Sequence, residues 1–142
     1  MPYATLQQLK DRFGERMLIG LTDRGEVATG EIDQDVIDRV LADTDEEING
    51  RVSVRYQMPL ASVPPLLTDL ALQIAIYKLH VYEPDAKVVR DYQRALATLT
   101  EIAKGTVRLD LAGVEPETQD GGGALVTDRD RPFQADKMTG FI

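Results

Sequence analysis

One segment of the chain is apolar on every side of a helix. In "PPLLTDLALQIAIYKLHVYEP", which spans Pro64 to Pro84, large aliphatic residues recur at short and varied steps. The two leading prolines suit the first turn of a helix, and Pro84 suits its end. A helix that is apolar all round is buried on nearly all sides. The chain therefore has to place this helix at its centre and cover it with other elements.

Three further segments carry apolar residues on one face only, as helices packed around a buried centre do. The first runs from Thr5, a suitable N-cap, to Gly14, and "ERMLIGL" directly after it adds a turn or two. The second begins at Asp33 and runs to about Gln57, before Pro59, and the third spans Asp85–Lys104. Together the four segments predict an all-α fold, with a compact four-helix core over residues 1–105.

The second of these helices contains "ADTDEEINGRVSVRYQMPL", which begins acidic and ends in basic and aromatic residues. Gly50 lies inside it and costs about 1 kcal/mol relative to alanine, so we expect it to permit the close approach of another helix. Glu47 is placed to pair with Arg51 one turn later. The residues expected to face the core are Ile48, Val52 and Tyr56.

Beyond the core, residues 106–124 predict a short extended segment followed by a flexible glycine-rich linker. Residues 125–142 carry six large apolar side chains: Leu125, Val126, Phe133, Met138, Phe141 and Ile142. Their full burial would contribute roughly 9–18 kcal/mol. Ordering the backbone costs roughly 18–36 kcal/mol, so burial alone does not fix the segment. We expect a C-terminal docking arm that orders on contact with a partner, and a disordered tail is the open alternative.

The net charge of −8 argues against direct nucleic-acid binding, because a chain that grips phosphates carries the opposite sign. The acids gather between Glu31 and Glu47, where Arg39 is the single basic residue. A solvated acidic face is the simplest interpretation of this pattern. The acids expected on the exposed face of the helix include Asp38, Asp43, Asp45 and Glu46.

Few residues of the sequence are suited to catalysis. There is no cysteine, and His80 is the one histidine, inside the central helix. Asp69, Gln73 and His80 could share a face and polarise a water, but the same pattern describes a stripe of buried hydrogen bonds. We therefore expect no enzyme, no cofactor and no metal site. Four tyrosines are expected at the rims of the core with their hydroxyls in water: Tyr56, Tyr77, Tyr82 and Tyr92.

The apolar runs are too short to span a bilayer, and the N-terminus "MPYATLQQLKDRFG" has no apolar signal region. These features predict a soluble cytosolic product with no membrane partner.

The chain resembles a known family in several stretches that occur in order along nearly its whole length. The stretches are "YATLQQLKDRFGERMLIGLTDR", "ADTDEEINGRVSVRYQMPL", "PPLLTDLALQIAIYKLH", "VRDYQRALATLTEIAKGTVRLDL", and the later "RDRPF" and "MTGF". They resemble the Mu-like phage and prophage structural proteins, a domain of unknown function. That family is similar to the head–tail connector (adaptor) proteins of tailed phages and gene transfer agents. No single motif among the stretches is diagnostic; the likeness lies in their order.

The resemblance implies a helical adaptor that binds beneath the portal as a ring, with twelve copies expected. The ring would contact the next neck or tail-completion protein, and DNA would pass through it without specific binding. The arm would reach a neighbouring component through Arg131, Phe133, Met138, Phe141 and Ile142. The candidate channel face would consist of Asp38, Asp43, Asp45 and Glu46. The expected location is the neck of the virion, and the host cytoplasm during assembly.

Two alternatives from other classes remain open. A free-standing acidic regulator, such as a DNA-mimic inhibitor of a DNA-binding enzyme, would bind a basic partner with strong salt dependence and would need no C-terminal arm. An enzyme using Asp69 and His80 would lose turnover in Asp69→Ala while particle assembly continued.

Overall fold

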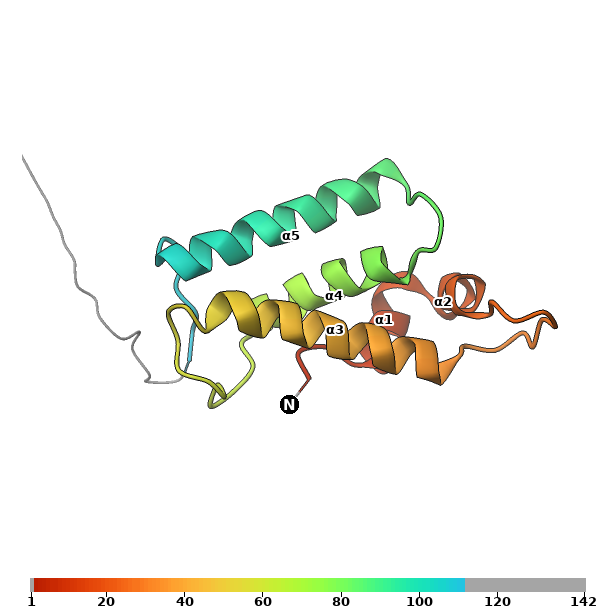
Figure 1. Cartoon of the computed structure of the whole chain (residues 1–142), viewed down its shortest axis with the longest axis horizontal. Coiled ribbons are helices and arrows are strands. Elements are labelled where there is room, and N and C mark those ends of the chain that lie inside the picture. Colours follow the sequence, from red (N-terminus) through yellow and green to blue (C-terminus); the bar gives the residue numbers. More distant parts are fainter. Residues whose placement is uncertain (1, 112–142) are drawn as a thin grey trace, which may run out of the picture.

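The computed structural model describes residues 2–111, which form a helical body with no strand among them (Figure 1). Its helices are α1 (Leu6–Phe13), α2 (Glu15–Thr22), α3 (Gln34–Val52), α4 (Pro65–Leu79) and α5 (Ala86–Lys104). The predicted all-α fold is confirmed. None of these helices combines the length and apolar character needed to cross a membrane. The predicted arm and most of the predicted linker lie outside the described residues, so the boundaries at residues 105 and 124 stay predictions.

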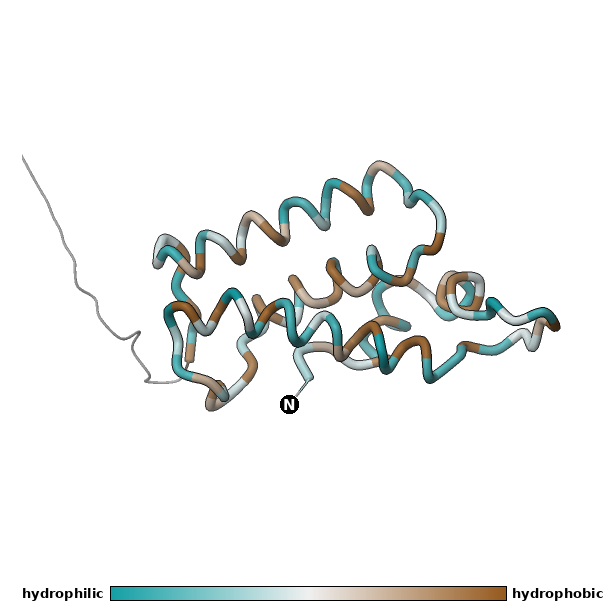
Figure 2. Tube along the Cα trace, viewed as in Figure 1, coloured by the Kyte–Doolittle hydropathy of each residue, from teal (hydrophilic) through white to brown (hydrophobic). Residues whose placement is uncertain are grey.

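Helix α4 is the buried centre that its sequence requires. Pro64 is its N-cap and Pro65 opens its first turn, where a missing N–H costs nothing. It contacts α1, α3 and α5, and Figure 2 shows it as mainly apolar between two helices that alternate between apolar and polar. Its side chains are buried on all sides: Leu67, Leu70, Ala71, Leu72, Ile74, Ala75, Ile76 and Leu79. The helix ends at Leu79, so Val81, expected within it, is 59% exposed in the following loop.

Helix α3 buries the apolar stripe that the sequence predicts, including Ile37, Ile48 and Val52. The expected end at Gln57 is wrong, because the helix stops at Val52 and the chain turns at Ser53. The backbone N–H of Tyr56 still donates to the carbonyl of Val52, and the Tyr56 ring enters the core with 4% of its surface exposed. The turn thus lets Tyr56 contact a segment that follows α5.

That segment, residues 105–111, turns at Gly105 and then runs to Leu111 without forming a helix or a strand. Leu109 and Leu111 are buried, whereas Arg108 and Asp110 are exposed. The Leu109 N–H donates to the Tyr56 hydroxyl over 3.0 Å inside the body. The expectation that this hydroxyl faces water is therefore wrong: Tyr56 supplies the acceptor that a neighbouring strand would supply in a sheet. Tyr82, at 87% exposure, does reach solvent.

The N-terminal helices add one element to the predicted four. Thr5 caps α1 by accepting from the Gln8 N–H, and the Gln8 side chain accepts from the Thr5 N–H in return. Gly14 has a φ of 92°, which ends α1 and lets the chain start α2 in a new direction. The stretch predicted as a short continuation is thus a separate helix of 8 residues.

The loop between α2 and α3 is held by one carboxylate. Asp23 accepts from the backbone N–H groups of Thr29 and Gly30 at 2.9–3.1 Å. These hydrogen bonds, led by that from Gly30, lower the pKa of Asp23 below its ordinary value. At the base of the loop the buried Thr22 hydroxyl accepts from the Asp33 N–H at 3.0 Å. These hydrogen bonds fix the path of the loop from the end of α2 to the start of α3.

Gly105 ends α5 in the left-handed conformation, with a φ of 87°. A Cβ placed there would lie 2.6 Å from the Cζ of Arg55, so the guanidinium covers the space of a side chain. Gly50 differs from Gly105 in both backbone conformation and surroundings, because it lies within helix α3 and has open space beside it. It is exposed on α3, and a Cβ there would meet nothing within 4 Å. Within one copy of the chain, the helix contact expected at Gly50 is absent from the described residues.

Gly50→Ala is expected to raise the free energy of unfolding by about 0.5–1 kcal/mol, because alanine restricts the unfolded chain and meets no obstacle in the folded one. Gly105→Ala is the matched comparison and should lower it by about 1 kcal/mol or more, because a left-handed residue gains a side chain that collides with Arg55. Urea unfolding followed by circular dichroism measures both. A destabilised Gly50→Ala variant would contradict the open environment of this glycine.

Candidate interaction surfaces

The acids predicted on α3 do not form one uniform surface. Asp43 and Glu46 are exposed, and Asp38 is exposed while accepting a hydrogen bond from the Gln34 amide at 2.8 Å. Asp45 is partly buried beneath the N-terminal segment. The exposed acids define a surface that we call the acidic α3 face: Asp35, Asp38, Asp43 and Glu46. Arg39 is the one exposed basic residue on the helix and lies within this face, one turn from both Asp35 and Asp43.

Asp45 is a structural contact. It accepts the Tyr3 N–H at 3.1 Å, and one turn further along α3 Asn49 accepts from the Tyr3 hydroxyl. These contacts hold the buried Tyr3 and Ala4 against α3. Partial burial raises the pKa of Asp45, outweighing the hydrogen bond from Tyr3, and the charge of Glu46 acts in the same direction as burial.

Asp45→Asn should therefore make the protein more stable at neutral pH. Because the folded pKa is raised above the ordinary 3.8, the ionised carboxylate is disfavoured in the folded state, and stability falls as pH rises through this range. Asparagine keeps an oxygen that accepts from Tyr3 and removes the charge. Urea unfolding at several pH values should show an advantage for the variant at pH 7 that shrinks as pH approaches 3.8. A variant less stable than the parent at neutral pH would contradict this account.

Glu47 links helices inside the body. It pairs with Lys78 of α4 at 3.1 Å, and with Arg51 of its own helix at 3.8 Å, as the sequence predicts for Arg51. Partial exposure keeps the contribution of each pair within about 1 kcal/mol. Glu47 is therefore the acid of α3 that pairs with another helix within one copy of the described chain.

Helix α5 presents a surface of opposite sign. Its exposed charged residues are all basic, and we call them the basic α5 face: Lys87, Arg90, Arg94 and Lys104. Lys87 pairs with Asp91 at 2.7 Å. That hydrogen bond, together with the nearby charges of Arg94 and Arg90, lowers the pKa of Asp91. Sequence analysis missed this face, although the spacing of three and four residues between its first three members could have indicated it.

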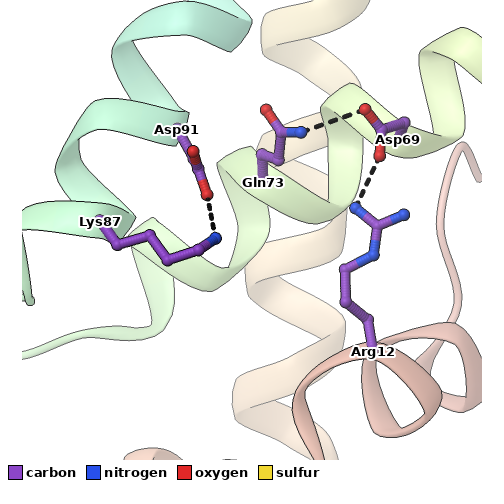
Figure 3. A network of polar contacts seen from close by, with 5 residues as sticks. All are labelled: Arg12, Asp69, Gln73, Lys87 and Asp91. Atoms are coloured by element: carbon purple, nitrogen blue, oxygen red, sulfur yellow. Dashed lines mark hydrogen bonds and ion pairs between the residues drawn. The ribbon is translucent and has the colours of Figure 1, made fainter.

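A groove of about 420 Å³ lies between the α1–α2 pair, α4 and the start of α5. Its apolar lining comes from Phe13, Met17, Ile76 and Val88. Figure 3 shows its polar side, where Arg12 reaches from α1 to Asp69 on α4 at 2.7 Å and the Gln73 amide donates to the other Asp69 oxygen at 3.1 Å. The Lys87–Asp91 pair stands on the α5 side. An apolar side chain flanked by a charged group fits such a lining.

The proposed catalytic constellation is not brought together. Asp69 and Gln73 are bonded to each other, but His80 is the C-cap of α4, roughly 16 Å along the helix from Asp69. The His80 Nδ1 lies 2.8 Å from the carbonyl oxygen of Ile76. Tyr77, expected at a rim of the core, stacks on Tyr92 of α5 with ring centroids 3.9 Å apart. The contacts of Asp69 and Tyr77 join helices to one another.

The arm residues predicted to bind a partner lie outside the described residues: Arg131, Phe133, Met138, Phe141 and Ile142. Their role stays a prediction. The described chain ends at Leu111, beside the C-terminal ends of α3 and α5. The groove lies at the other end of the body, where α5 begins. The described chain therefore ends far from the groove of its own copy.

Comparison with known proteins shows which family the chain is related to. The chain is 28% identical to gene product J of Escherichia phage Mu over 142 residues, covering all of both chains. It is 24% identical over 140 residues to the Mu-like prophage FluMu protein gp36 of Haemophilus influenzae, covering 99% of this chain and 98% of that protein. Residues 3–128 match the family described as Bacteriophage Mu, Gp36, and this match includes every described helix. The chain belongs to this Mu-like phage protein family.

Proposed function

We propose that this protein is a head–tail connector, an adaptor that binds beneath the portal as a ring and joins it to the next neck or tail component. Membership of the Mu phage family over residues 3–128 supports a role in a phage particle. The observation that carries the connector role is the form of the body. A rigid three-helix centre exposes two charged helices, and 31 further residues (112–142) follow the described end of the chain.

The packing of the core favours a rigid body that can transmit force between its neighbours without changing shape. Most of α4 is buried against α3 and α5, and the Glu47–Lys78 pair and the Tyr77–Tyr92 stack join it to α3 and to α5, respectively. A close-packed interior of this kind resists deformation. A ring of such bodies can support the load between a filled head and a tail.

The overall charge suits a structure through which DNA passes. With a net charge of −8 the chain repels the phosphate backbone at long range, so DNA is not retained. In this proposal the portal and the adjacent neck protein are the partners, and residues 125–142 make one of these contacts. The virion neck is the site of action, reached by assembly in the host cytoplasm.

Deleting the gene from the genome that encodes it tests this function. Electron micrographs of the lysate should show filled heads and separate tails, and the parent gene supplied in trans should restore joined particles. Arg16→Glu, an exposed change on α2 away from the acidic α3 and basic α5 faces, should restore them equally well. Normal joined particles without the gene would contradict the connector role. They would favour a regulator, whose loss leaves assembly intact.

A further inference from the structure

We propose that neighbouring copies of this chain bind each other head to tail, the basic α5 face of one copy against the acidic α3 face of the next. This inference rests on the proposed ring and names the surfaces that would form it. The partner is a second copy of the same chain, because the chain itself carries both complementary surfaces.

The charges on both faces are largely without partners inside one copy. Among the described residues the side chains of Arg90 and Arg94 make no ion pair or hydrogen bond, although their charges influence Asp91. On α3, Asp43 and Glu46 make no ion pair or side-chain hydrogen bond within the described part of the chain. By contrast, Glu47 and Lys78, which face the interior of the same body, are paired. On the two faces, Lys87 pairs with Asp91 and Asp38 accepts a hydrogen bond from Gln34; the other named charges make no such contact among the described residues.

Each face also carries like charges at helical neighbour positions. Arg90 and Arg94 are one turn apart on α5, and Asp43 and Glu46 are three residues apart on α3. Like-charged neighbours at these spacings repel and disfavour the helix that holds them. A surface of opposite sign removes that repulsion when it binds. Both helices therefore gain from the same contact.

One copy cannot satisfy its own faces. α3 and α5 contact each other as well as α4, and in Figure 1 they lie on opposite sides of α4. The exposed residues of each helix point away from α4, so the two faces look outward from different sides. A contact between two different patches is heterologous, and repetition of such a contact generates a ring if the rotation closes. This is the symmetry that a connector beneath a portal needs.

The helix of the acidic face also contains the glycine that the fold leaves unexplained. Gly50 is exposed on α3 and an added Cβ would meet no atom within 4 Å, yet glycine in a helix interior costs about 1 kcal/mol. Ala42 is likewise exposed on α3, and Ala97 is exposed on α5. Small residues on both surfaces let two helices approach closely. The close approach expected at Gly50 from the sequence would then be made by the neighbouring copy.

This inference gives the acids of α3 a different use from the lining of the channel. If Asp43 and Glu46 face the basic α5 face of a neighbour, they are covered by protein and do not meet DNA. The two uses predict different results for charge reversal. A channel lining is not repaired by a second reversal on α5, whereas a contact between copies is.

The test uses complementation of the gene deletion with three charge-reversed chains. The first carries Arg90→Glu and Arg94→Glu, the second Asp43→Lys and Glu46→Lys, and the third carries all four changes. Each of the first two places like charges across every contact and should reduce joined particles at least about tenfold. The third restores opposite charges at every contact and should recover most of the loss. Arg16→Glu and Glu26→Lys are matched reversals outside both faces and should have no effect.

All the altered side chains are exposed, so each variant should fold. Circular dichroism checks this before complementation. Joining at the parent level with either single-face reversal would overturn the inference and leave the connector role intact, because the parent gene is still required. Failure of the four-fold variant to recover would also overturn it, and would assign the basic α5 face to another partner such as DNA. Joined particles without any copy of the gene would instead refute the proposed function.

A cross-link gives an independent measure of the same contact. The chain has no cysteine, so Glu46→Cys together with Arg94→Cys introduces the only two thiols. A disulfide or a short bifunctional reagent should join copies into a ladder of covalent oligomers in assembled particles. A chain with Arg16→Cys in place of Arg94→Cys should give no ladder. Absence of a ladder from the first pair, in particles that contain the protein, counts against the contact.

Discussion

Leu70→Ala should lower the free energy of unfolding by about 2–5 kcal/mol, a large part of the about 5–15 kcal/mol typical of a domain. Leu70 is 4% exposed on α4, the helix that contacts α1, α3 and α5. Removing its side chain deletes buried apolar surface and leaves a cavity. The surrounding side chains come from several helices, so they cannot all move in to fill it. Urea unfolding followed by circular dichroism at pH 7 measures the effect.

Leu66→Ala is the matched control, the same change one turn earlier on the same helix. Leu66 is only partly buried, so its loss should cost clearly less than the loss of Leu70. Equal losses at the two positions would mean that α4 is not the centre of the body. A loss under about 1 kcal/mol for Leu70→Ala would lead to the same conclusion.

Removing residues 125–142 should abolish the joining of heads and tails while leaving the unfolding of the body unchanged. The buried side chains of the described body already form a core around α4, so we expect the body to keep its stability without the arm. The arm needs a partner, because burying its apolar side chains contributes roughly 9–18 kcal/mol against roughly 18–36 kcal/mol of backbone entropy. Complementation of the gene deletion, with thermal unfolding of the purified chain, measures both effects.

A sharper variant keeps the length of the chain. Phe133→Ser with Phe141→Ser removes two of the apolar side chains predicted to bind the partner, and should reduce joined particles at least about tenfold. Gln119→Ala, in the predicted linker, is the control and should have no effect. Full joining by the truncated chain would show that the arm is not a docking element. A large fall in thermal stability would show instead that the arm belongs to the core.

The central part of this fold could be predicted because its signals are local. The apolar run of α4, the Thr5 cap, the stop at Gly14 and the stripe of Ile37, Ile48 and Val52 are each visible in a short stretch of sequence. The stop of α5 at Gly105 is of the same kind. Such signals determine where helices begin and which side they bury.

The features that sequence analysis missed depend on residues far apart in the chain. The end of α3 at Val52 is stabilised by the burial of Tyr56, whose hydroxyl binds the Leu109 N–H. The groove is formed by α1, α2, α4 and α5 together. Asp45 has the sequence pattern of an exposed acid, and only the fold brings Tyr3 against it. No periodicity within a single helix reports such contacts.

The most direct test of the connector role is an image of the neck itself. Cryo-electron microscopy of complete particles should show a ring of helical bodies between the head vertex and the tail, each with α4 held between α3 and α5. Mass spectrometry of the same particles should detect this chain in several copies. Complete, tailed particles that lack both the density and the chain would contradict the account.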